Sequence, residues 1–168
     1  MAGIIAAVLA DDFEDTEFTE PAQAYREAGH TVVVIAKTNG TLTGKHGTKV
    51  TVDRTIEDVR PDEFDALLIA GGYSPDSLRD DERFVAFAKA FMEQDKSVFA
   101  ICHGPQLLIT AGVLKGRHVT GYRSIAVDLV NAGAHYADQD VVVCRHLVTS
   151  RTPADIPAFN RESLKQLG

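Results

Sequence analysis

The sequence contains no tryptophan and only two cysteines and two methionines among its 168 residues. The apolar stretch at the N-terminus has no basic segment before it and soon reaches acidic residues, so it lacks the features of a secretory signal. So few cysteines without such a signal argue against a secreted domain held together by disulfides. We therefore expect a cytoplasmic protein in which Cys102 and Cys144 stay reduced, and we expect Cys144 to be structural.

Long apolar runs and clustered basic residues are missing as well. No run approaches the roughly 18 apolar residues that a membrane-spanning helix needs. The formal net charge is -7 at pH 7, and the longest basic cluster, residues 115–118, is short. Because nucleic acids and anionic membranes attract clustered Lys and Arg, we expect neither as a partner.

The chain does contain short, continuous apolar runs that alternate with helical patterns. Continuous apolar residues indicate strands buried on both faces, as in a parallel sheet covered by helices. The expected strands are 4–10, 31–36, 66–70, 98–101 and 141–143, and the expected helices are 17–28, 81–94, 103–111, 125–132 and 157–167. Segments 44–52 and 141–149 have the pattern of hairpins. The alternation predicts one domain over residues 1–168, a doubly wound α/β layer sandwich.

Residues 98–108, Val-Phe-Ala-Ile-Cys-His-Gly-Pro-Gln-Leu-Leu, place Cys102 between a buried strand and a helix. Ala100 and Gly104 give the small-x-nucleophile-x-small spacing of a nucleophile elbow, a tight turn with a strained backbone in which bulky neighbours would clash. A cysteine at a helix N-terminus faces unpaired N–H groups that stabilise its thiolate. We therefore predict that Cys102 is nucleophilic and oxidisable, and that His103 accepts its proton or stabilises an oxyanion.

Two further segments are expected to meet Cys102 at the carboxyl edge of the sheet, where ligands of doubly wound folds collect. Residues 11–15 contain four acids, which are either a solvated helix start or the source of one carboxylate beside the cysteine. A buried carboxyl there would have a raised pKa and could hold a proton for the thiolate. Residues 70–76 contain Gly71 and Gly72, which form either an ordinary turn or the backbone N–H donors of an oxyanion hole.

Together these motifs resemble the ThiJ/PfpI superfamily, closest to the PfpI branch of intracellular proteases and general stress proteins. The resemblance covers essentially the whole chain. The segments that carry it are Glu14-Asp15 with Glu17, and residues 44–47, 64–68, 71–76, 100–105, 131–133 and 149–153. It implies a flavodoxin-like fold, with a mostly parallel sheet and helices on both faces in a three-layer sandwich. It also implies a homo-oligomer, either a dimer or a hexamer.

The resemblance implies roles for individual residues as well. Cys102 matches the nucleophile and His103 its partner, and Tyr122 matches a tyrosine near the pocket. Asp76 matches a carboxylate that completes the site of a neighbouring subunit, although by its position alone it could instead cap the following helix. Asp12 matches the glutamate that hydrogen-bonds the cysteine from the end of the first strand, and its side chain is one methylene shorter.

No set of His, Cys and acidic residues has zinc spacing, and no Walker or dinucleotide glycine pattern appears. We therefore expect neither a metal nor an organic cofactor.

The preferred function is a stress-protective enzyme of the glyoxalase III or deglycase kind. In it Cys102 adds to a reactive carbonyl such as methylglyoxal, forms a hemithioacetal and releases a hydroxy acid. The alternatives are a PfpI-type cysteine peptidase acting on peptides and a non-enzymatic stress protein that senses oxidants through Cys102.

Overall fold

Seven strands form the central sheet, in the order β10-β11-β7-β6-β1-β2-β5. Neighbouring strands run parallel except β10 and β11, which are antiparallel. The strands are β1 (Ile4–Val8), β2 (Thr31–Ala36), β5 (Arg54–Thr55), β6 (Ala66–Ile69), β7 (Ser97–Ile101), β10 (Val142–Cys144) and β11 (Leu147–Ser150). This computed structural model, which describes residues 2–168, confirms the mostly parallel, doubly wound sheet.

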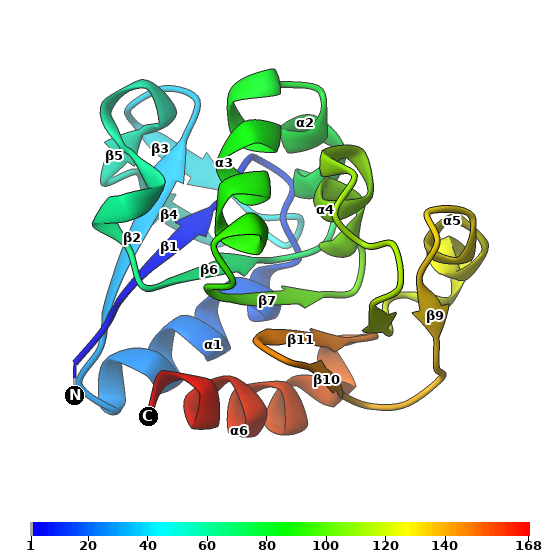
Figure 1. Cartoon of the computed structure of the whole chain (residues 1–168). Helices are drawn as coiled ribbons and strands as arrows, with labels where there is room; N and C mark the ends of the chain where they lie inside the picture. The colour runs from blue at the N-terminus through cyan, green and yellow to red at the C-terminus, as the bar shows by residue number, and fades with distance from the viewer. Residues whose placement is uncertain (1) are drawn as a thin grey trace.

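Helices cover both faces of this sheet, which makes three layers (Figure 1). One face carries α1 (Asp15–Glu27) and α6 (Ile156–Leu167), and the other carries α2 (Ser74–Arg79), α3 (Glu82–Glu93) and α4 (Pro105–Ala111). Beside the β10 edge, α5 (Ala126–Asn131) packs with a small parallel pair, β8 (His118–Val119) and β9 (His135–Tyr136).

Side chains of the central strands alternate between two apolar clusters, one on each face of the sheet. In β1, Ile5 and Ala7 join the cluster that contains Tyr25 of α1. Ala6 and Val8 join the opposite cluster, which contains the apolar residues of α3 and α4. Because successive side chains of a strand point to opposite faces, a strand covered on both sides needs apolar residues throughout, and this explains the continuous runs in the sequence.

Three local features differ from the sequence expectations. Cys102, His103 and Gly104 form a turn, so α4 begins at Pro105 rather than at His103. Helix α2 and the short strands β5, β8 and β9 had no counterpart among the predicted elements. Asp76 lies inside α2 and caps no helix; the cap of α3 is Asp81, whose side chain accepts the N–H of Arg83.

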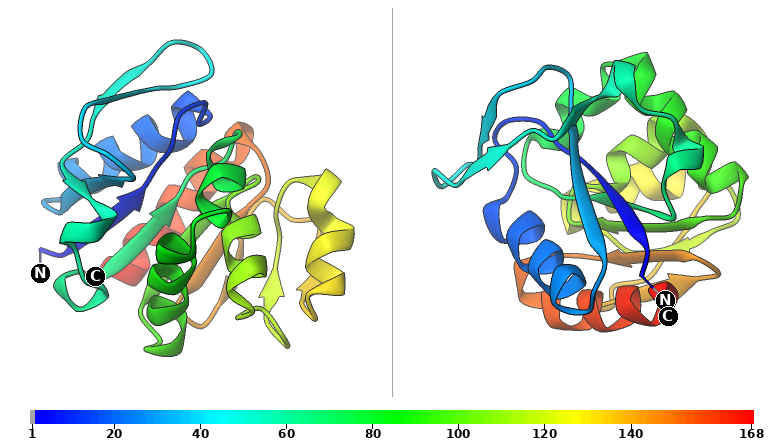
Figure 2. Two further views of the ribbon diagram at one scale, coloured as in Figure 1. Left: turned by 90° about the horizontal axis from the view of Figure 1, so that it is seen from above. Right: turned by 90° about the vertical axis from the view of Figure 1, so that its left-hand side faces the viewer.

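The segment 44–52, predicted to form a hairpin, contains the turn and second strand of one whose first strand lies before it. The two strands are β3 (Thr41–Thr43) and β4 (Lys49–Thr51), and the hairpin projects from the body of the protein (Figure 2). Two of the four clustered acids anchor it to the loop after β1. Asp11 accepts the N–H of Thr43 at 2.8 Å, and Asp15 accepts the N–H groups of His46 and Thr48 at 2.9 Å each. Although burial would raise the pKa of Asp15, hydrogen bonds from Thr48 and His46 lower it to about 2. Asp11 and Asp15 therefore have structural roles.

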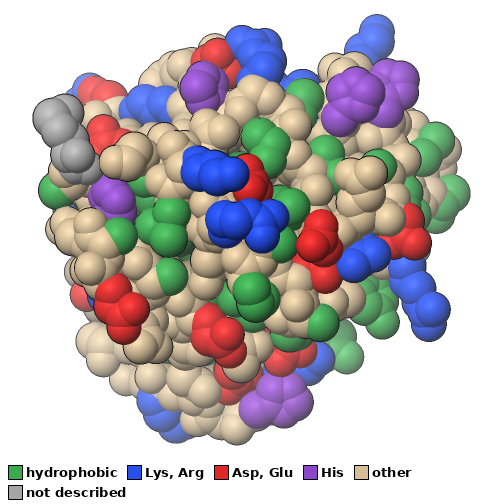
Figure 3. Space-filling model, turned by 90° about the horizontal axis from the view of Figure 1, so that it is seen from below, with side chains coloured by type: hydrophobic (Ala, Val, Ile, Leu, Met, Phe, Trp, Pro, Cys, Tyr) green, Lys and Arg blue, Asp and Glu red, His purple; other side chains and the backbone are tan. Residues whose placement is uncertain are grey.

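Over residues 2–168, no helix combines the length and apolar character required to span a membrane. On the side of the molecule that carries α1 and α6, acidic and basic side chains are interspersed (Figure 3). That face therefore presents no continuous surface of one charge.

Candidate active site

Cys102 occupies the sharp turn between β7 and α4, with φ at 62°. Its N–H donates to the carbonyl of Ser150 and its carbonyl accepts the N–H of Tyr122, both at 2.9 Å, so the strained residue is held from two sides. A Cβ atom at Gly104 would lie 2.5 Å from the carbonyl oxygen of Ile69, so this position requires glycine. The elbow geometry predicted from the sequence spacing is confirmed.

The carboxyl group beside Cys102 comes from Glu17, in the first turn of α1. Glu17 is fully buried, and its Oε1 accepts the N–H of Gly71 at 2.8 Å. Its Oε2 has no hydrogen-bond partner in residues 2–168, and the Cys102 thiol is close enough to the carboxyl to affect its pKa. A Cβ at Gly71 would overlap the Glu17 carboxyl and approach the Cβ of Cys102 to 2.9 Å. Glycine at position 71 therefore lets the two reactive groups meet.

Burial raises the pKa of Glu17 to about 8, although the hydrogen bond from Gly71 opposes the shift. The carboxyl is therefore mostly protonated at neutral pH. Burial also raises the pKa of the Cys102 thiol, a negative charge on Glu17 raises it further, and the backbone N–H of His103 acts in the opposite direction. The expectation that the helix N-terminus alone ionises Cys102 is wrong, because burial outweighs it. A protonated Glu17 removes the repulsion and can donate its O–H to the thiolate.

Asp12 does not lie beside the sulfur, contrary to the role that the resemblance assigns to it. Its side chain is exposed, its N–H donates to Thr43 and its carbonyl accepts the N–H of Tyr73. The chain turns after β1 so that the first turn of α1, and not the end of the strand, reaches Cys102. The sequence did contain a sign of this role for Glu17. It is an acidic residue at a position of an amphipathic helix that faces the core.

His103 connects the sulfur with a second side chain. Its Nδ1 lies 3.5 Å from the Sγ of Cys102, and its Nε2 lies 3.4 Å from the Oγ of Ser124. Its ring stacks on Tyr122 with centroids 4.9 Å apart. Burial, and then the charge of Lys45, lower the pKa of His103, so the imidazole is neutral at pH 7 and able to accept a proton. Nothing in the sequence pattern marked Ser124.

Cys102, His103 and Tyr122 line a cleft of about 560 Å³. Some of its other lining residues were not singled out in the sequence. Its lining consists of Glu14, Lys45, Gly72, Tyr73, Asp76, Cys102, His103, Gln106, Tyr122 and Pro153. The Gly71 N–H is bound to Glu17, whereas the Gly72 N–H is donated to none of residues 2–168. Of these two N–H groups, that of Gly72 is therefore the one left for a ligand, and its role as an oxyanion donor stays a prediction. Asp76 is exposed at the rim of its own chain's cleft, and its role towards a second copy stays a prediction.

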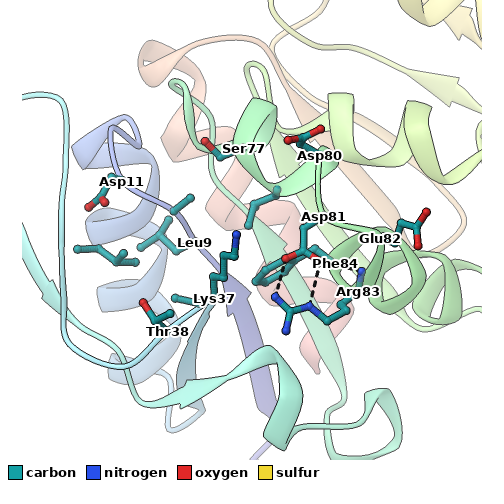
Figure 4. Close-up of a pocket in the computed structure, with 14 residues that line it drawn as sticks. Leu9, Asp11, Lys37, Thr38, Ser77, Asp80, Asp81, Glu82, Arg83 and Phe84 are labelled. Carbon is teal, nitrogen blue, oxygen red and sulfur yellow. Dashed lines mark hydrogen bonds and ion pairs between the residues drawn. The ribbon is translucent and has the colours of Figure 1, made fainter.

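A second cavity, of about 680 Å³, lies at the carboxyl ends of β1 and β2 (Figure 4). It shares α2 with the cleft, since Asp76 faces the cleft whereas Ser77 and Leu78 line the second cavity. Its floor is apolar and its rim carries charges of both signs, including Lys37 and the hydrogen-bonded pair of Arg83 and Asp81. None of the catalytic or binding residues predicted from the sequence lines it.

Comparison with known proteins shows the family of the chain. The family model described as the DJ-1/PfpI family matches residues 4–166. The chain is 64% identical to general stress protein 18 of Bacillus subtilis (strain 168), over 97% of this chain and 96% of that protein. It is 56% identical to protein/nucleic acid deglycase 2 of Escherichia coli (strain K12), over 100% of this chain and 99% of that one.

Among solved structures, the chain matches a two-domain protein of Anabaena variabilis that contains DJ-1/ThiJ/PfpI-like and ferritin-like domains. The TM-score is 0.96 and the sequence identity is 40%, over 98% of this chain and 48% of that one. The second domain of that protein accounts for the difference in length. The resemblance drawn from the motifs is confirmed: the chain belongs to the DJ-1/PfpI family.

Proposed function

We propose that this protein is a cysteine-dependent enzyme that converts reactive 2-oxoaldehydes, such as methylglyoxal, into hydroxy acids. The observation that carries the proposal is the fully buried Glu17, whose pKa is raised to about 8, against the thiol of Cys102. A nucleophile, Cys102, and a neutral base, His103, thus share one cleft, and a neutral acid, Glu17, is buried beside the nucleophile. The similarity to a protein named as a deglycase and to one named as a general stress protein supports the same choice.

The first step is addition of the thiol to the aldehyde. The Sγ of Cys102 forms a bond to the aldehyde carbon while the carbonyl π bond breaks, and the thiol proton passes to Nδ1 of His103, 3.5 Å away. The developing oxyanion accepts the Gly72 N–H, and the proton that His103 took from the thiol then neutralises it, directly or by exchange through Glu17, so that His103 and Glu17 are both neutral again. The product is a hemithioacetal on Cys102.

The second step moves a proton within the bound substrate. A base removes the hydrogen from the carbon attached to sulfur, and a proton returns to the neighbouring carbon, so that a thioester of a 2-hydroxy acid results. His103 is positioned for this transfer, since its other nitrogen is held by Ser124. Water then cleaves the thioester, which releases the hydroxy acid and restores the thiol. The net reaction consumes one water and needs no external oxidant or reductant, because one carbon is oxidised as its neighbour is reduced.

The proposal is tested by incubating the protein with methylglyoxal and measuring both aldehyde loss and lactate formation. The wild type and Cys144→Ser should form lactate at equal rates, because Cys144 lies outside the cleft. Cys102→Ser should fall to the uncatalysed rate. Aldehyde loss without lactate, or equal lactate formation by Cys102→Ser, would overturn the proposal.

Peptide hydrolysis through an acyl-enzyme is a second candidate, because the free Gly72 N–H suits the oxyanion of a tetrahedral intermediate equally well. Cleavage of a fluorogenic peptide that is lost in Cys102→Ser and retained in Cys144→Ser would favour it. If both variants and the wild type are inactive in both assays, oxidation sensing through Cys102 becomes the better account. Its signature would be a peroxide-dependent mass increase at that residue.

A further inference from the structure

Lys45, at the tip of the β3–β4 hairpin, places a cation in the cleft. Its Nζ lies 3.5 Å from the Oε1 of Glu14 and 5.4 Å from the centroid of the Tyr73 ring. Its side chain is only 33% exposed, and it lines the same cleft as Cys102. A lysine on a projecting hairpin is normally extended into solvent, so this docked position calls for a physical reason.

The backbone around Lys45 is held in place by the loop after β1. The Lys45 N–H donates to the carbonyl of Phe13 at 2.9 Å, and Asp15 binds the N–H groups of His46 and Thr48. These bonds link the hairpin tip to the loop that leads into α1, the helix that carries Glu17. The ammonium therefore has a defined position relative to the reacting groups.

The ammonium of Lys45 also keeps binding capacity to spare. An ammonium group has three donors, and the Glu14 contact at 3.5 Å is a long one. Glu14 is shared, because its Oε2 lies 3.1 Å from the Nε2 of His46. Lys45 is the only lysine or arginine among the lining residues, and the exposed carboxylate of Asp76 is also among them. An anionic group that enters the cleft is attracted by Lys45 and repelled by the carboxylates of Glu14 and Asp76, so its favourable position is at the Lys45 ammonium and away from Asp76.

We propose that Lys45 binds a carboxylate on the substrate, so that the preferred substrates are 2-oxoaldehydes carrying an anionic group a few bonds from the aldehyde. This inference rests on the carbonyl chemistry proposed above and narrows its substrate class. Lys45 is then a specificity-determining residue, because a neutral oxoaldehyde offers no charge for its ammonium to bind.

The test compares 4,5-dioxopentanoate, a 2-oxoaldehyde with a carboxylate, with its neutral methyl ester and with methylglyoxal. The wild type should show a kcat/KM for the acid about tenfold above that for the ester, mainly through a lower KM, as expected for one charged contact. In Lys45→Met the ratio of kcat/KM for the acid to kcat/KM for the ester should fall to about one, and Lys45→Arg should restore most of the preference.

The matched control is Lys49→Met, on the same hairpin. The Lys49 ammonium donates to the Thr43 hydroxyl at 2.8 Å and does not line the cleft, so this variant should keep the wild-type preference. Thermal unfolding verifies that each variant is folded.

Equal kcat/KM for acid and ester in the wild type, or an equal loss for both substrates in Lys45→Met, would overturn this inference and leave the carbonyl function standing. If the wild type turns over none of the three compounds, the proposed function itself fails, and the inference fails with it.

Discussion

Two cavities of comparable size share α2 as a wall, and their charged groups behave differently. At the cleft of about 560 Å³, burial raises the pKa of Cys102, which lines it, and of Glu17, which is buried beside Cys102; the cysteine also has a strained backbone. In the cavity of about 680 Å³, hydrogen bonds from Arg83 lower the pKa of Asp81, and Lys37 is exposed. Volume and charge are common to both. The candidate active site is distinguished by buried titratable groups whose hydrogen bonds do not offset the effect of burial on their pKa.

The largest effect on turnover is expected from removing the acid beside the sulfur. Glu17→Gln keeps the shape of the side chain but can neither give nor take a proton, so kcat for 2-oxoaldehyde turnover should fall about 100-fold. Asp12→Asn, which changes the exposed acid that sequence matching had favoured, should stay within about twofold of the wild type. Steady-state rates of lactate formation measure both variants. The reverse order of effects would return the catalytic role to Asp12.

The same carboxyl is expected to make the free energy of unfolding depend on pH. The pKa of Glu17 in the folded protein, about 8, exceeds its ordinary value of 4.5, so the folded state binds this proton more tightly than the unfolded state does. The resulting stabilisation is complete below about pH 4.5 and is lost as the pH rises through about 8, a change on the order of 5 kcal/mol.

Urea unfolding at a series of pH values measures this dependence. The wild type should lose stability towards alkaline pH, and Glu17→Gln should lose much less over the same interval, because an amide does not ionise. Parallel curves for the two proteins would mean that Glu17 is already ionised at neutral pH.

The smallest effect is expected in the second cavity. Lys37→Met removes its exposed cation (Figure 4), yet kcat and KM for methylglyoxal should change by less than about twofold. A loss of turnover comparable to that of Glu17→Gln would show that the cavity communicates with the cleft through α2.

The sequence predicted the features that depend on neighbouring residues. Continuous apolar runs identified the main strands, and the spacing of small residues around Cys102 identified the elbow. The β3–β4 hairpin also had a recognisable pattern over residues 44–52, because apolar residues alternate there with polar ones.

The features that depend on packing could not be predicted in the same way. Whether Asp12 or Glu17 reaches the sulfur is decided by where the chain turns after β1. The thiol was expected to ionise because local dipoles are visible in a sequence, whereas the burial that opposes ionisation comes from distant segments. Ser124 meets His103 only after the fold brings together residues 21 positions apart. The sequence therefore located the nucleophile but not the groups that control its proton.

The central claim is that a protonated Glu17 lies against the sulfur of Cys102 at neutral pH. Infrared spectroscopy of the wild type and of Glu17→Gln at pH 7 tests it directly, because a protonated carboxyl has a carbonyl stretch that a carboxylate lacks. The account predicts that this band is present in the wild type, absent from Glu17→Gln, and lost from the wild type as the pH passes about 8. Identical spectra for the two proteins in this region at pH 7 would contradict it.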